Sequence, residues 1–552
     1  MSAVQPKRTQ LFSHARFDLP RLLSLAENLR QRPCACDESQ IPKAGAFNWV
    51  IFLRFDDGVE WVFRAPRSQC PGSKDGIAKL PASEVATLRY IRQNTTIPVP
   101  EVFHYNSSYT NDIGTPYILM SKAPGRPLAA AWTWPTHTLD VPQLDTRRIG
   151  GSPSPPRPLK DSGKSSIMRQ LGGYAAQLYP CRFQAIGSLF EEGAPEDMGG
   201  TEGDAPTAYR VGECLAPGLL MLDRETLEDL PRGPFSTDAD YYEALVRALL
   251  LHAEQLPMGH HLFRAPIPIP HEYDSFAAYR LATDRWNDYA SLGGKIDASH
   301  NRLQYSLAAF ILRDEVLPSL AAGSRVSSGY PLCHQDLSMQ NIFVDDDLHV
   351  TCLIDWAFCT TVPPAQLLAA PGLPHPRDYS ADADLAAAYR AGFEEVLVAR
   401  NTCGSSSSSR SRDGPPLPLP GAADWAAGTM TAHLLRLVNL DALQDYHHLE
   451  ALCALTAARA GPDASLDLPH LLAAQADTPD AKDLAALLAE DDEPESEVKR
   501  RESAYFEAVG PDRLALARKI TSMAERNPGF VADKRLWRHV ERIVAETRLD
   551  GK

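Results

Sequence analysis

The chain has 552 residues, which at ~100–200 residues per domain allows about two to four structural units. Hydrophobic residues make up 44% of it and charged residues 23%, as in an ordinary globular protein. Its formal net charge of −15 would repel a phosphate backbone, so we expect no nucleic acid partner.

The sequence also lacks the marks of a membrane or secreted protein. Charged residues interrupt its most apolar stretches well before the ~20 residues that a membrane span needs. The N-terminal segment has basic residues with no apolar run behind them, which argues against a secretory signal, although its Arg-bearing, acid-free start leaves a transit peptide open as an alternative. The 10 cysteines are scattered and do not form a disulfide framework. We therefore expect a cytoplasmic protein with no membrane partner.

The first part of the chain has the pattern of a small sheet with helices. Apolar residues at helical spacing predict a leading helix over 17–31. The runs NWVIFLRF and VEWVFRAP, joined by a DDG turn, predict a β-hairpin over 48–66. Helical spacing returns over 83–95, and two more strands are predicted within 97–105 and 115–125. We predict an N-terminal helical extension at 1–40 and a sheet-bearing lobe at 41–122.

The rest of the chain reads as mainly helical. Stretches rich in proline, glycine or charge predict inserted loops near 131–166 and 191–212, within a larger lobe spanning 123–400. Helical periodicity is strong in DADYYEALVRALLLHAEQ and ASHNRLQYSLAAFILRDEVLPSL. The Ser/Pro-rich residues 401–421 predict a linker, and 422–552 a helical C-terminal part.

Candidate chemistry is concentrated in GYPLCHQDLSMQNIFVDDDLHVTCLIDWAF, residues 329–358. NIFV and HVTCLI predict a second hairpin around an aspartate-rich turn. Because antiparallel strands return the chain beside its start, we expect Asp355 to lie near Asn341 and Asp336. Phosphoryl transfer needs a carboxylate that accepts the attacking hydroxyl's proton, and further oxygen ligands for Mg²⁺. This cluster supplies both.

The same motifs resemble a known family. HQDLSMQN is similar to the catalytic loop HxDxxxxN of aminoglycoside phosphotransferases and their choline-kinase-like relatives, and LIDWAF resembles their following IDW motif. AGAFNWVIFLRF, WVFRAP, SEVATLRYI, IPVPEVFHY and GTPYILMSKAPGRPL follow in family order. The resemblance implies an α+β, bilobal protein-kinase-like fold, with an antiparallel N-lobe sheet, one helix and a larger, mainly helical C-lobe.

The resemblance also implies a reaction, the transfer of the ATP γ-phosphoryl group to a hydroxyl of a small molecule. In the catalytic loop, Asp336 would be the base and His334 would brace the loop, while Asn341 and Asp355 would hold Mg²⁺. On the nucleotide side, the implied ATP-binding residues are Gly45, Phe47 and Asn48 in the loop between the first strands, Arg64, Glu84, and the hinge residues Met120, Ser121, Lys122 and Ala123.

Two alternatives remain open. Arg64 stands where the family pattern has lysine, so the chain could be a catalytically weak or inactive pseudokinase-like binding module. Arg64 and Glu84 could equally be an ordinary surface ion pair. A protein kinase is disfavoured because no activation segment ending in APE follows Asp355. The sequence does not identify the acceptor molecule.

Overall fold

The computed structural model describes most of the chain between residues 17 and 526. The described residues are 17–44, 47–67, 74–132, 159–192, 208–259, 261–264, 268, 273, 276–292, 295–321, 329–373, 382–403, 417–441 and 445–526. None of the helices in these segments is long and apolar enough to cross a membrane.

The N-terminal lobe is built on one antiparallel sheet. Its strands are β1 (Cys34–Cys36), β2 (Lys43–Ala44), β3 (Asn48–Phe55), β4 (Glu60–Pro66), β5 (Val102–Asn106) and β6 (Tyr117–Ser121). They follow the order β1-β3-β4-β6-β5, with β2 paired to β3. The predicted hairpin is confirmed, with Asn48 opposite Pro66 and Arg54 opposite Glu60.

Helices cover the two faces of this sheet. Side chains alternate between faces along a strand, and one face packs Trp49 and Phe63 against Leu22 and Ala26 of α1 (Leu19–Arg30). The other face packs against α2 (Lys74–Asn94). Helix α2 begins at Lys74, before the predicted start at residue 83, and Pro81 lies inside it. Helix α1 and strand β1, which fall within the predicted extension 1–40, pack as part of this lobe, and residues 1–16 lie outside the described residues.

A short link carries the chain from the sheet to the larger lobe. After β6 it enters β7 (Arg126–Pro127), which pairs with β12 (Ile342–Val344), the first strand of the hairpin that β13 (Val350–Leu353) completes. Gly125 has φ +83°, and a Cβ there would lie 2.5 Å from the Val344 carbonyl oxygen. This glycine lets the link pass directly against the hairpin.

The larger lobe is mainly helical. Its longer helices are α4 (Asp161–Leu178), α6 (Asp238–Gln255), α7 (Phe276–Ser291), α8 (Ser299–Ile311), α11 (Ala383–Cys403), α12 (Ala422–Val438), α13 (Asp445–Ala460), α14 (Leu468–Ala476), α15 (Pro479–Ala489), α16 (Glu495–Val509) and α17 (Pro511–Arg526). Its short helices are α3 (Leu128–Ala131), α5 (Pro217–Leu220), α9 (Leu317–Ala321), which a π-helical turn (Leu312–Val316) joins to α8, and α10 (Pro364–Leu367). Short strands are β8 (Arg182–Phe183), β9 (Leu189–Glu191), β10 (Tyr209–Val211), β11 (Tyr330–Cys333) and β14 (Thr360–Thr361).

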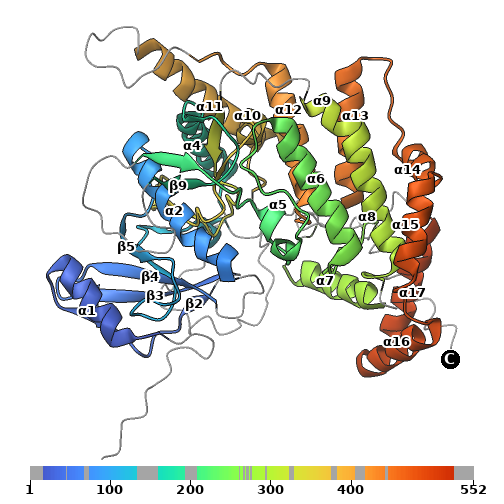
Figure 1. The fold of residues 1–552 in the computed structure, drawn as a ribbon, viewed down its shortest axis with the longest axis horizontal. Coiled ribbons are helices and arrows are strands. Elements are labelled where there is room, and N and C mark those ends of the chain that lie inside the picture. The colour runs from blue at the N-terminus through green and yellow to red at the C-terminus, as the bar shows by residue number, and fades with distance from the viewer. Residues whose placement is uncertain are drawn as a thin grey trace, which may run out of the picture.

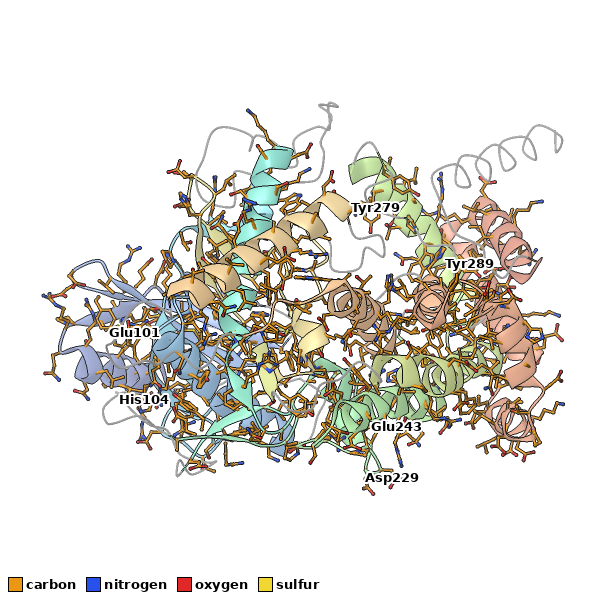
Figure 2. All side chains as sticks on the ribbon, turned by 90° about the horizontal axis from the view of Figure 1, so that it is seen from above. Glu101, His104, Asp229, Glu243, Tyr279 and Tyr289 are labelled. Carbon is orange, nitrogen blue, oxygen red and sulfur yellow. The ribbon has the colours of Figure 1, made fainter. Side chains whose placement is uncertain are left out.

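Figure 1 shows the sheet and α1 at one end of the molecule and α14 to α17 at the other. In the view from above, Glu101 and His104 of the sheet lobe lie far from Tyr289 on α7 (Figure 2). The α+β class and the division into a sheet lobe and a larger helical lobe are confirmed.

Several predicted boundaries differ from the structure. Residues 161–166 belong to α4 and 209–211 to β10, so both predicted loops are shorter than expected; 133–158 and 193–207 lie outside the described residues. Helix α11 continues into the predicted linker as far as Cys403, and 404–416 are again outside the description. Helices α12 and α13 share one hydrophobic core with α6 and α8. Helices α12 and α13, which fall within the predicted C-terminal part, therefore pack as part of the larger lobe.

Candidate active site

The catalytic hairpin brings its two ends together as predicted. Ile342 lies opposite Leu353, and the Ile354 N–H donates to the Asn341 carbonyl oxygen at 2.9 Å. Asp355 therefore emerges beside Asn341. The Asn341 side-chain nitrogen donates to the Asp336 carboxylate and to its backbone carbonyl, both at 3.0 Å. Asn341 thus ties the base candidate to the hairpin.

His334 links the loop that carries Asp336 to the end of the hairpin. The Asp336 N–H donates to His334 Nδ1 at 3.1 Å, so Nε2 carries the ring proton and donates it to the Ile354 carbonyl at 3.0 Å. Burial lowers the pKa of His334, which favours this neutral form. With both ring nitrogens engaged, the imidazole connects the chain before Asp336 to the chain before Asp355.

The site raises the pKa of Asp336 to about 6. Its side chain is reached by solvent, yet the largest cause of the rise is that the surrounding cleft excludes water. The negative charges of Asp355 and Asp441 contribute to the rise, while the Asn341 hydrogen bond and Arg436 oppose it. A carboxylate with a pKa in this range suits general-base work near neutral pH.

Arg64 links the two lobes by an ion pair with Asp355. From β4 its guanidinium contacts Glu84 of α2 and Asp355, the latter at 2.5 Å. The Asn48 side-chain oxygen, oriented toward Arg64, accepts from Nη2 at 2.6 Å. Only 11% of the Arg64 side chain is exposed and 4% of Glu84. The ion pair between them is therefore not an ordinary surface pair.

Asp355 has an unusual backbone. Its φ is +66°, in the left-handed region that few residues other than glycine adopt. This conformation follows directly on β13 and turns the chain so that the carboxylate meets Arg64. Burial raises the pKa of the neighbouring Glu84, and the positive charge of Arg64 opposes that rise.

The predicted nucleotide side of the site is narrow. A pocket of about 40 Å³ is lined by Asn48, Arg64 and Glu84 together with Phe47 and Phe358, whose rings meet edge to face with centroids 5.5 Å apart. Phe47, Asn48, Arg64 and Glu84 are thus brought together. Gly45 lies outside the described residues.

The predicted hinge residues stand apart from this pocket. Met120 is paired on both sides, with Val62 and with Val102. The Ser121 N–H donates to the Glu101 carbonyl at 2.8 Å, and the Ser121 hydroxyl accepts from the Glu101 N–H. The sheet therefore uses the Ser121 donor, and Met120, Ser121 and Ala123 do not line either described pocket.

A larger pocket of about 160 Å³ is lined by Asp336 itself. Its polar lining includes Gln335, Arg436 and Asp441, with a 3.1 Å ion pair between the last two. Arg436 and Asp441 come from α12 and the turn after it, within the predicted helical C-terminal part at 422–552. They belong to no motif, and only the packing of α12 against α6 and α10 brings them to the loop.

The donor set fits magnesium. Among the described residues, no group of three or more His, Cys, Asp and Glu side chains could hold a metal by itself. Mg²⁺, however, usually takes one or two protein oxygens and completes its shell with waters and substrate phosphates. The Asp355 carboxylate is a donor of this kind. The side-chain oxygen of Asn341 is another, because the side-chain nitrogen of Asn341 already donates to Asp336.

Comparison with known proteins is consistent with this geometry. The sequence model of the phosphotransferase enzyme family matches residues 204–397, about a third of the chain. A subtelomeric hrmA-associated cluster protein of Aspergillus fumigatus is 32% identical over 148 residues, which is 27% of this chain and 24% of that protein. The mitochondrial protein "altered inheritance of mitochondria protein 9" of Yarrowia lipolytica is 30% identical over 222 residues, 38% of this chain and 34% of that protein. The matches thus span about a quarter to a third of these relatives.

The solved structures that this chain resembles are distant in sequence. Macrolide 2′-phosphotransferase MphH from Brachybacterium faecium superposes with a TM-score of 0.33 at 16% identity, covering 79% of this chain and 98% of its own. The resemblance carried by HQDLSMQN and LIDWAF is confirmed at the level of the family: the segment that holds Asp336, Asn341 and Asp355 matches the phosphotransferase enzyme family.

Proposed function

We propose that this protein transfers the γ-phosphoryl group of ATP to a hydroxyl of a small molecule. The observation that carries the proposal is the convergence of Asp336, Asn341 and Asp355 on one hairpin end, with Arg64 reaching Asp355 from the opposite lobe. The match of residues 204–397 to a phosphotransferase family supports it.

Each residue has a defined task in this reaction. The acceptor oxygen attacks the γ-phosphorus, the bond from that phosphorus to the β,γ-bridging oxygen breaks, and ADP leaves. The Asp336 carboxylate accepts the acceptor's proton. Asn341 and Asp355 hold Mg²⁺, which neutralises charge on the phosphates when bound. Arg64 binds phosphate oxygens and is itself held by Glu84.

The two substrates enter from different sides of Asp336. ATP occupies the side of Arg64, and because the pocket there is small, Phe47 and Phe358 separate when the nucleotide enters. Adenine lies along the hinge from Met120 to Ala123, with its backbone contacts beyond Ser121, whose N–H is used by the sheet. The acceptor occupies the pocket lined by Arg436 and Asp441.

The first test measures nucleotide binding by thermal unfolding of the full chain. A ligand at ~100 times its dissociation constant adds about 2.7 kcal/mol to the free energy of unfolding, so ATP with Mg²⁺ should raise the melting temperature. ATP with a chelator is the control, and its shift should be smaller. No shift at millimolar ATP and Mg²⁺ would favour the inactive binding module.

The second test looks for the reaction. ADP release is followed while amino alcohols, sugars and aminoglycosides are offered one by one, with the water reaction as background. Acceptor-dependent ADP release that Asp336→Asn abolishes supports the proposal. Nucleotide binding without acceptor-dependent release from any compound would instead leave a binding function.

A further inference from the structure

The hairpin formed by β9 and β10 contacts both the helix that carries Glu84 and the segment that follows Asp355. Its strands pair antiparallel, with Leu189 opposite Val211 and Glu191 opposite Tyr209. Figure 1 shows β9 lying beside α2, and the packing of the two elements is extensive. We refer to residues 185–192 and 208–215 as the brace hairpin.

Two ion pairs join the brace hairpin to α2. Arg89 Nη1 contacts both carboxylate oxygens of Glu191, at 3.0 and 3.1 Å. Ten residues earlier on α2, Lys79 Nζ lies 2.7 Å from Glu213. At 1.5 Å per residue these anchors are ~15 Å apart along the helix, one on each side of Glu84. They fix the helix at two points rather than at one.

The Arg89 pair is buried. Only 13% of the Arg89 side chain and 7% of Glu191 are exposed. Arg89 Nε and Nη2 have no hydrogen-bond partner among the described residues, so the carboxylate of Glu191 carries the electrostatic pairing. Removal of one member of such a pair leaves the other charge buried and uncompensated, which is costly.

Aromatic and hydrogen-bond contacts extend this interface. The Tyr209 hydroxyl donates to Gln93 Oε1 at 3.0 Å. The Tyr209 ring meets Tyr90 edge to face, with centroids 5.2 Å apart. These contacts therefore hold the last two turns of α2 against the brace hairpin.

On its other edge the brace hairpin holds β14. The Thr361 N–H donates to the Gly187 carbonyl at 2.8 Å, and the Gly187 N–H donates to the Thr361 hydroxyl at 2.9 Å. A Cβ on Gly187 would lie 2.2 Å from the Gly212 carbonyl, so glycine is required for the two strands to meet. Thr360 and Thr361 are fully buried and follow Asp355 by five and six residues.

We propose that the brace hairpin positions the nucleotide side of the active site, and that Arg89 and Glu191 are positioning residues. It holds α2 and β14 together, and these elements carry Glu84 and the chain leading from Asp355, the two acidic partners of Arg64. The inference rests on the proposed function for its consequence in catalysis, because Arg64 is the residue proposed to bind the ATP phosphates. The brace itself is a property of the fold.

The decisive variant is Glu191→Gln, which keeps the shape of the side chain and removes its charge. The dissociation constant for ATP with Mg²⁺ should rise about tenfold, and the KM for ATP with it, while the KM for the acceptor stays unchanged. The charge-exchanged double variant, Arg89→Glu with Glu191→Arg, should recover part of the loss. Glu395→Gln is the matched control, because it removes one partner of the exposed Arg169–Glu395 pair.

Hydrogen exchange without nucleotide separates this proposal from the proposed function. In Glu191→Gln, amides of residues 84–94 and of Thr360–Thr361 should exchange faster, while those of α6 should not change. Unchanged exchange in α2 overturns the brace, whether or not ATP binds the parent protein. Faster exchange in α2 with unchanged ATP affinity overturns the positioning role.

A milder variant covers the case in which Glu191→Gln fails to fold. Tyr209→Phe removes only the hydrogen bond to Gln93 and keeps the ring against Tyr90. It should raise exchange in the last turns of α2 in the same direction by a smaller factor. No change in α2 exchange would contradict the proposal.

Discussion

The two pockets of the site differ in how their charges are satisfied. On the proposed nucleotide side, Arg64 lines a pocket of about 40 Å³ and is paired with both Glu84 and Asp355. On the acceptor side, a pocket of about 160 Å³ leaves Asp336 reached by solvent, with a pKa raised to about 6. One side is closed by its own ion pairs, and the other is open.

This difference suggests what each side contributes to the proposed reaction. A guanidinium that already has two carboxylate partners is pre-oriented, so little ordering remains when phosphates arrive. A carboxylate that is costly to ionise holds a proton more readily than usual, which is a property of a general base rather than of a structural ion pair.

The strongest prediction concerns the open side. Asp336→Asn should lower turnover by ~10²–10⁴-fold, because general-base catalysis contributes about that much. The affinity for ATP with Mg²⁺ should change little, since Arg64 and Asp355 are untouched. Turnover from ADP release and affinity from calorimetry give the two numbers. An equal loss of both would show that Asp336 is structural and that the two sides are not separate.

On the closed side, Asp355→Ala should remove the magnesium dependence of ATP binding. The variant loses a proposed Mg²⁺ ligand and also one of the two acidic partners of Arg64. Calorimetric titration with and without Mg²⁺ measures the effect, and Asp346→Asn on the exposed hairpin turn is the matched control. If Asp355→Ala binds the magnesium complex as the parent does, the metal assignment is wrong.

A smaller effect is expected for Arg64→Lys. Lysine keeps the positive charge but cannot contact Glu84, Asp355 and Asn48 through one planar group. ATP affinity should fall by about tenfold at most, with turnover at saturating ATP less affected. Steady-state kinetics at varied ATP would reveal this split. Full retention of the KM for ATP would mean that a point charge is enough at this position.

The smallest effect is on stability as a function of pH. The folded-state pKa of Asp336, about 6, lies above its ordinary value of 3.8, so ionisation of this carboxyl costs native stability. Without nucleotide, Asp336→Asn and the parent should melt alike below pH ~4, and the variant should melt higher as the pH rises to about 6 and above. Melting curves between these limits measure the difference.

A variant of a neighbouring carboxylate tests the cause of the raised pKa of Asp336 by the same measurement. Asp441→Asn removes one of the negative charges that raise the pKa of Asp336. When both proteins carry Asp441→Asn, the stability difference between the parent and Asp336→Asn should therefore be smaller and should reach its plateau at a lower pH. An unchanged divergence would assign the raised pKa to burial and Asp355 alone.

Local sequence was sufficient for the elements closest to the chemistry. Two strand-like runs joined by a DDG turn predicted β3 and β4 as a hairpin, and the aspartate-rich turn predicted the hairpin of β12 and β13. Hairpins are readable because pairing partners are close along the chain, and the period of two fixes which side chains share a face. The proximity of Asp336, Asn341 and Asp355 followed from the same rule.

The boundaries of helices and strands were less predictable where local residue preference disagreed with the structure. Pro81 argued against helix, yet α2 runs through it, and the polar residues after α1 form β1 against β3. In both cases packing of the neighbouring residues outweighs local preference.

The sequence by itself determined the class of the fold, the catalytic hairpin and the residues proposed for base and metal, because these depend on short-range pattern and motif spacing. Only the tertiary structure decided that Arg64 spans Glu84 and Asp355, that Arg436 and Asp441 reach Asp336, and that Glu191 anchors Arg89. These contacts join residues about 20 to 290 positions apart. Such pairings depend on how helices pack, which periodicity in one segment does not encode.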